Sequence, residues 1–169
     1  MKTTSGRRAE ARGSAPRFRL EDYLPYRLSV TAGRISRLLS RKYAEAYGLS
    51  IAEWRVLAMV GRFGTLSPSA VGELTTMDKV KVSRAAASLV AHGLVRQRPD
   101  PSDGRGRLLS LTRKGTAVHR GMLPLACEVE KQLAHGLSRG EWSALLKALD
   151  RLNAQVLAVD GSGVGDEIE

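Results

Sequence analysis

The chain has 169 residues, 43% of them hydrophobic and only 5% aromatic, which fits one compact domain or a small domain with dimer-forming extensions. Its formal net charge of +10 favours a polyanionic partner such as nucleic acid. The sequence has no apolar run long enough to cross a bilayer and no signal-peptide core, so we expect a cytoplasmic protein without a membrane partner.

The two ends of the chain are polar and carry opposite charges. Residues 1–19 are small, polar and basic, and we interpret them as a disordered tail. Residues 159–169 contain four acidic residues and no basic residue, and we interpret them as a disordered acidic tail. Because these two charges nearly offset each other, most of the positive charge belongs to the part of the chain between them.

Two helices are predicted in the first third of the chain. Apolar residues recur on one helical face between Leu24 and Leu38, and Gly48 ends this first helix. Ser50 and Glu53 have the spacing of a capping box, which predicts the start of a second helix.

A short helix and a second, longer one follow. Ser67-Pro68 combines an N-cap with a proline at the first helical position, and Asp78 is an N-cap that follows closely. Gly93 stands where a helix C-terminus favours glycine. The inward side of the helix after Asp78 is predicted to consist of Val82, Ala85 or Ala86, and Leu89.

After Gly93 the sequence pattern changes from helical to strand-like and predicts a β-hairpin. The segments 94–98 and 107–111 are strand-like, and Pro99–Gly104 between them is rich in turn residues. Thr112 caps a long helix to about His135, and Ser138 with Glu141 forms a second capping box. The last helix carries a stripe of apolar residues, Trp142, Leu145, Leu149, Leu152 and Val156.

This order of elements predicts a mainly α fold with a small β-hairpin wing, a winged helix-turn-helix. In such a fold the second helix of the motif enters the major groove of double-stranded DNA with its N-terminal residues. That helix begins after Asp78, and its exposed polar residues are predicted to contact guanine edges or phosphates. These DNA-binding candidates are Lys79, Lys81, Ser83 and Arg84.

The hairpin supplies a second group of candidates. Arg105 and Arg107 lie at or near its tip, and a narrow minor groove attracts inserted arginine. Asp103 is placed to hold Arg105 extended through a charge-assisted hydrogen bond. We therefore expect Arg105 and Arg107 to bind DNA and Asp103 to support the wing.

Residues from about Leu20 to Leu152 resemble the MarR (multiple antibiotic resistance regulator) family. The matching segments are Gly48–Leu57, Met77–Arg84, Gly93–Val95, Asp100–Arg105 and Leu111–Gly115. The wing is the most specific of them, because its Asp-x-Arg stands at the expected distance before Leu-Thr-x-x-Gly. Family members usually have a further basic residue at Ser102 or Gly104, which this chain lacks.

The resemblance implies a ligand-responsive repressor that binds a pseudo-palindromic operator as a homodimer. It assigns residues 20–49 to a dimerisation helix, residues 50–112 to the DNA-binding lobe and residues 113–158 to further dimerisation helices. It also implies an effector site between these parts, with Tyr26, Arg34 and Trp54 as candidates for binding an aromatic carboxylate or an acyl-CoA. A simpler interpretation makes Trp54 a core residue and Arg34 a surface charge.

The remaining residues favour no catalytic or metal site. Cys127 is the single cysteine, so it forms no intrachain disulfide, and we expect a buried and inert thiol. The three histidines lack metal-ligand spacing, and we expect no metal and no cofactor. Two other classes stay open: a basic RNA- or ribosome-associated protein, and an enzyme acting on an anionic substrate, although no nucleophile or phosphate-binding motif supports the enzyme.

Overall fold

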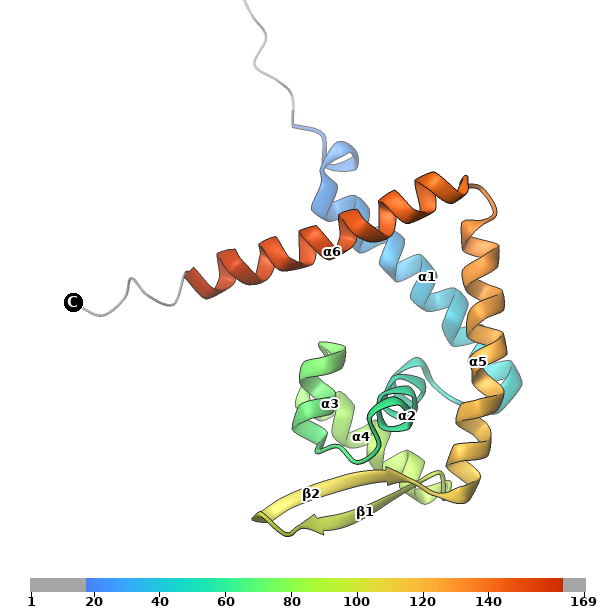
Figure 1. The fold of residues 1–169 in the computed structure, drawn as a ribbon, viewed down its shortest axis with the longest axis vertical. Helices are drawn as coiled ribbons and strands as arrows, with labels where there is room; N and C mark the ends of the chain where they lie inside the picture. The colour runs from blue at the N-terminus through green and yellow to red at the C-terminus, as the bar shows by residue number, and fades with distance from the viewer. Residues whose placement is uncertain (1–17, 163–169) are drawn as a thin grey trace, which may run out of the picture.

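The computed structural model describes residues 18–162, apart from the side chains of residues 104–105 and 161–162. It is mainly helical with one antiparallel hairpin, which confirms the predicted fold class (Figure 1). Of the tails predicted at residues 1–19 and 159–169, residues 1–17 and 163–169 lie outside the described residues. The elements in chain order are the 3-10 helix η1 (Leu20–Asp22), α1 (Leu24–Tyr47), α2 (Ile51–Phe63), α3 (Pro68–Thr75), α4 (Lys79–Ala91), β1 (Val95–Asp100), β2 (Asp103–Leu111), α5 (Arg113–Ala134) and α6 (Arg139–Ser162).

The predicted helix starts are confirmed by their capping contacts. Ser50 Oγ accepts a hydrogen bond from the Glu53 amide at 3.3 Å, and the Glu53 carboxylate accepts one from the Ser50 amide at 2.7 Å. The side chains of Asp78 and Thr112 each accept from the amide three residues later, at 2.8 and 3.0 Å. At the end of α4, Gly93 has a φ of 68°, a left-handed conformation that favours glycine.

The lobe around α4 has its own hydrophobic core. Helices α2, α3 and α4 pack together, and β2 joins them through Leu66, which exchanges two backbone hydrogen bonds with Leu109 at 2.8 and 3.0 Å. The hairpin pairs Val95 with Leu111 at its base and projects away from the helices (Figure 1). The fully buried residues of this core include Val56, Leu57, Val60, Val71, Val82, Leu89 and Leu109. The predicted inward side of α4 is thus confirmed, with Ala85 and Ala86 both buried.

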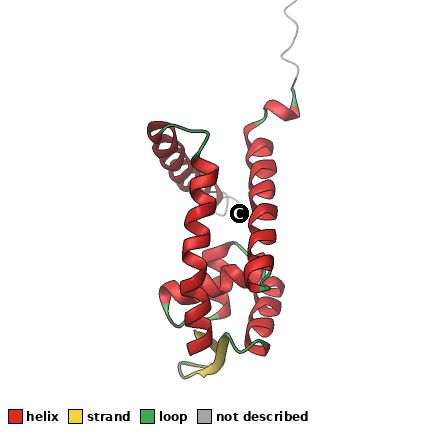
Figure 2. Ribbon diagram, turned by 90° about the vertical axis from the view of Figure 1, so that its right-hand side faces the viewer, coloured by secondary structure: helices red, strands yellow, loops and turns green. Residues whose placement is uncertain are grey.

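Helices α1, α5 and α6 extend beyond this lobe. Helix α5 runs along one side of it, α1 crosses beside α5, and α6 turns away above the lobe (Figures 1 and 2). Helix α6 continues to Ser162, past the boundary expected at residue 158, because the sequence contains neither glycine nor proline from Glu141 to Asp160. Within residues 18–162, no helix is both long and apolar enough to cross a membrane.

Candidate nucleic-acid interface

The turn between α3 and α4 is tight enough to fix the angle between the two helices. Thr76 has a φ of 53°, and the Met77 amide donates a hydrogen bond to the Gly72 carbonyl at 3.2 Å. A Cβ at Gly72 would lie 3.2 Å from the Met77 carbonyl oxygen, so a side chain there would press on the turn. This arrangement is the one that a helix-turn-helix uses to hold its second helix in the major groove.

The N-terminus of α4 presents its polar residues to solvent. Lys79, Lys81, Ser83 and Arg84 are all exposed, as predicted for residues that contact DNA. Lys81 Nζ lies 3.0 Å from Asp78 Oδ2, and both side chains are more than half exposed. The Lys81 backbone amide and then its ammonium group lower the pKa of the Asp78 carboxyl. An exposed ion pair of this kind is screened by solvent and contributes little to stability, so a phosphate can compete for Lys81.

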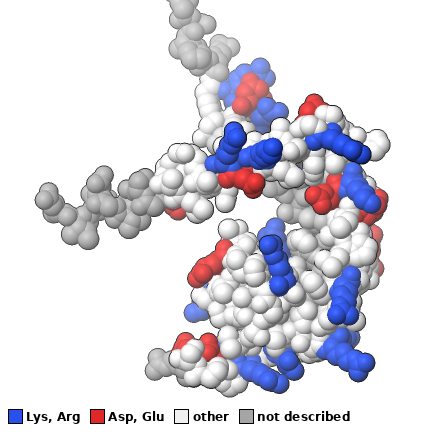
Figure 3. Space-filling view, in the orientation of Figure 1, with Lys and Arg blue, Asp and Glu red and all other residues white. Residues whose placement is uncertain are grey.

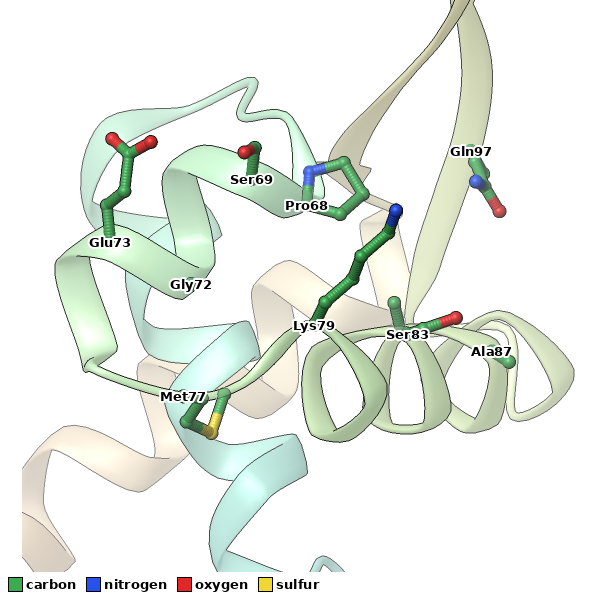
Figure 4. A pocket seen from close by; sticks show the side chains of 10 residues that line it. Pro68, Ser69, Gly72, Glu73, Met77, Lys79, Ser83, Ala87 and Gln97 are labelled. Carbon is green, nitrogen blue, oxygen red and sulfur yellow. The ribbon is translucent and has the colours of Figure 1, made fainter.

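A groove of about 580 Å³ separates α4 from α3 and the hairpin. Lys79 reaches up from the start of α4 toward the space between α3 and the strands, while Ser83 and Ala87 line the α4 side (Figure 4). Gln97, on β1, faces the groove from the hairpin. Sequence reasoning missed Gln97, because its place opposite α4 depends on how the hairpin packs.

A buried carboxylate holds α4 against α2. Glu53 is 8% exposed. Its Oε2 atom accepts a hydrogen bond from Ser50 Oγ at 2.6 Å, and its Oε1 atom accepts one from Ser88 Oγ on α4 at 2.5 Å. Burial by itself raises the pKa of the Glu53 carboxyl, but the hydrogen bonds from Ser50 and Ser88 outweigh it and hold that pKa below its usual value. The sequence indicated the Glu53 capping box but gave no sign of Ser88, which lies 35 residues further along the chain.

The hairpin carries basic residues along its length, as expected for a wing. Arg107 is exposed and pairs with Pro99 in the strand register, and Arg96 Nε donates a hydrogen bond to Ser110 Oγ at 2.9 Å. Asp103 is also exposed. The side chain of Arg105 lies outside the described residues, so the predicted contact between Asp103 and Arg105 stays a prediction.

Positive charge follows the lower edge of the lobe. In the view of Figure 1, Lys and Arg side chains gather below the hairpin and beside the first part of α5 (Figure 3). At the base of the hairpin, Lys114 Nζ donates a hydrogen bond to the His92 carbonyl at 3.1 Å, which joins the start of α5 to the end of α4. A surface of this charge attracts a polyanion.

The three effector candidates do not lie together in one chain. Trp54 is partly buried and stacks on Tyr43, with ring centroids 4.8 Å apart. Tyr26 and Arg34 are both exposed on α1. Because α1 is continuous, Tyr26 lies about 25 Å along the helix axis from Tyr43. These three residues therefore do not share a pocket within one chain, and the predicted effector site stays a prediction that involves a second chain.

Tyr43 is a residue that sequence reasoning missed. It is fully buried, and its hydroxyl has no hydrogen-bond partner in the described structure. Burial raises the pKa of the Tyr43 phenol. Leu39 also packs against the core, and Tyr43 stands four residues beyond it, so extending the apolar face of α1 by one turn would have found this tyrosine.

The prediction of a buried thiol at Cys127 is wrong for the single chain, in which Cys127 is exposed. Met122 and Val129 define the buried side of this part of α5. Cys127 lies about 140–160° around the helix from both of them, since each residue advances by about 100°. In the part of the chain that the structure describes, no three His, Cys, Asp or Glu residues are grouped so that they could hold a metal.

The sequence is similar to known transcriptional regulators. A sequence profile described as the MarR family matches residues 47–106. The HTH-type transcriptional repressor NicR of Pseudomonas putida is 26% identical over 140 residues, which cover 78% of this chain and 87% of NicR.

Two solved structures extend the comparison to three dimensions. A MarR family transcriptional regulator from Silicibacter pomeroyi is 31% identical, with a TM-score of 0.68 over 81% of this chain and 92% of its own. BpsR of Bordetella bronchiseptica, whose structure concerns regulation of its DNA binding by 6-hydroxynicotinic acid, is 24% identical with a TM-score of 0.66 over 75% and 98% of the two chains. The chain described here belongs to the MarR family of winged helix-turn-helix transcriptional regulators.

Proposed function

We propose that this protein is a sequence-specific DNA-binding repressor that acts as a homodimer. The observation that carries the proposal is the outward side of α4, where exposed Lys79, Lys81, Ser83 and Arg84 stand beside a basic hairpin. Arg84 and Ser83 would contact base edges, and the two lysines would contact phosphates. Repression is proposed because NicR, a relative over most of the chain, is a transcriptional repressor.

The wing would add contacts in the minor groove beside each major-groove site. Arg107 is exposed on β2, and Arg105 precedes it at the hairpin tip. Asp103 would keep the Arg105 guanidinium extended, as a carboxylate does when it accepts from both arms of the fork.

Dimerisation would involve the helices outside the lobe. Helix α6 exposes a row of leucines, among them Leu145, Leu149 and Leu152, each close to 40% exposed. Leu24 and Leu28 on α1 are exposed to a similar degree. Apolar surface on this scale needs a partner surface, and a second copy would also supply the second DNA half-site that two-fold symmetry requires.

The same features favour binding over catalysis. The exposed polar residues of the lobe point outward along a helix and a hairpin, an arrangement that suits an extended polyanion better than a small substrate. RNA is the rival polyanion, and a preference for duplex DNA over structured RNA would distinguish the two.

The proposed effector is a small aromatic carboxylate or an acyl-CoA. Trp54 supports it, because its partly buried ring offers a flat surface on which an aromatic ligand can pack, with the fully buried Tyr43 stacked behind it. BpsR, which shares the fold, is regulated by an aromatic acid. Arg34 would supply the cation for the carboxylate and Tyr26 a further ring, both from the second subunit of the dimer.

DNA binding can be tested by selecting duplexes from a random pool and measuring affinities by fluorescence anisotropy at fixed salt. The parent protein should enrich a pseudo-palindrome with half-sites about 10 bp apart and should prefer it to structured RNA. Arg84→Ala should weaken binding to the selected duplex by about 1–3 kcal/mol and relax one base preference. Arg139→Ala, an exposed arginine at the start of α6, is the matched control and should change neither. Equal binding to all duplexes, or preference for RNA, would contradict the proposal.

Effector binding can be tested by a thermal-shift screen of aromatic acids and acyl-CoAs, followed by release of the selected duplex. A ligand releases DNA only if it prefers the conformation that does not bind DNA. Arg34→Ala should lose the ligand response and keep DNA affinity. If Arg34→Ala responds like the parent, Arg34 has no part in the site.

A further inference from the structure

Val80 is the more exposed of the two exposed valines of α4, and neither DNA charge nor core packing explains its position. Val80 is 58% exposed in the first turn of the helix. The buried residues Val82, Ala85, Ala86 and Leu89 define the inward side. At about 100° per residue, Val80 lies almost opposite that side, next to Arg84 one turn later.

Val80 stands on a crest between two hollows. The groove of about 580 Å³ takes in Lys79, Ser83 and Ala87 on one side of α4. A smaller hollow of about 280 Å³, lined by Lys81, Arg84 and Ser88 among others, lies on the other side. Val80 lines neither of them, so it projects from the part of the helix that would enter a groove of DNA first.

An apolar partner is the chemistry that fits this position. A β-branched residue in an exposed helical turn loses side-chain freedom, and Val80 gains little packing within the chain in return. Its neighbours Lys79 and Lys81 are charged, so a protein partner that covered Val80 would have to desolvate two ammonium groups. In a DNA major groove the same ammonium groups meet phosphates while Val80 meets the base edges.

The only apolar group on the base edges of the major groove is the C5-methyl group of thymine. We propose that Val80 reads a thymine methyl in each half-site, a base preference that none of the charged residues of α4 would provide. This inference rests on the proposed function of α4 as the reading helix. Residues four apart on a helix are about 5–6 Å apart, and base pairs are about 3.4 Å apart, so the thymine lies within about two base pairs of the base read by Arg84.

The test replaces single thymines of the selected duplex by deoxyuridine, which lacks only the C5-methyl group. For the parent protein, replacing one particular thymine in each half-site should weaken binding about four-fold, which is the contribution to binding expected of one buried methyl-sized group. Val80→Ala should bind the thymine duplex about four-fold more weakly per half-site and should no longer distinguish thymine from deoxyuridine there. Val90→Ala removes the same atoms from an exposed valine near the far end of α4 and should keep the parent's response.

Each outcome bears on the assignment. If deoxyuridine has no effect at any position, or the same effect on the parent and on Val80→Ala, the assignment of Val80 is overturned while sequence-specific binding stands. If no duplex is enriched at all, the proposed function fails together with it. Melting temperatures of both variants near the parent's would confirm that the differences arise at the DNA.

Discussion

The contact between Glu53 and Ser88 should account for a measurable part of the lobe's stability. Glu53 accepts three hydrogen bonds, from the Ser50 amide, Ser50 Oγ and Ser88 Oγ. A hydrogen bond to a charged group contributes about 1.5–3 kcal/mol. Ser88→Ala removes one such bond and should cost about 1.5 kcal/mol, whereas Glu53→Ala removes all three and should cost about 3 kcal/mol or more.

A double-mutant cycle separates this contact from the rest of the site. Urea unfolding at one protein concentration would give the free energy of unfolding for the parent, both single variants and the double variant. The double variant should cost about as much as Glu53→Ala alone, so the coupling between the two positions should be about 1.5 kcal/mol. Glu73→Ala, which changes an exposed glutamate of α3, is the matched control and should stay within about 0.5 kcal/mol of the parent. Additive single effects would show that Glu53 does not hold α4 through Ser88.

Four further predictions follow from single features of the fold. Because folding lowers the pKa of Glu53, the ionised carboxylate stabilises the folded lobe fully above pH 4.5, the usual glutamate pKa, and this stabilisation is lost as the pH falls through the lowered pKa. The urea midpoint should therefore fall more steeply in acid for the parent than for Glu53→Gln. Tyr43→Phe removes a buried hydroxyl that has no partner in the described structure, and it should leave the melting temperature unchanged or raise it; a clear loss of stability would mean that this hydroxyl is hydrogen-bonded. Gly115→Ala should destabilise by about 1–3 kcal/mol or more in a thermal melt, since its Cβ would lie 2.9 Å from the Leu94 carbonyl carbon and still closer to the oxygen, whereas Gly140→Ala at an open position should be tolerated. Replacing both Leu149 and Leu152 by Glu should reduce the mass measured by light scattering from about twice 18.3 kDa to that of one chain, and it should abolish tight DNA binding. A parent protein that is a stable monomer with full DNA affinity would contradict this prediction.

Much of the local structure could be predicted from the sequence. The starts of α2, α4 and α5 lie where Ser50, Asp78 and Thr112 place them, and Gly93 ends α4 in the left-handed conformation. The inward side of α4 was also correct. The caps are satisfied by partners a few residues away along the chain, so the residues that decide where these helices start and stop are close in the sequence.

The tertiary structure decided which helices meet and which side chains they bring together. Trp54 was a candidate ligand contact, but its stacking on Tyr43 depends on how α2 packs on α1. Cys127 was expected to be buried, yet the rotation of α5 that buries Met122 and Val129 turns the thiol outward. Helical periodicity gives the spacing of residues around a helix, whereas the direction that a given side faces is set by the packing of the whole core, which joins residues far apart in the sequence.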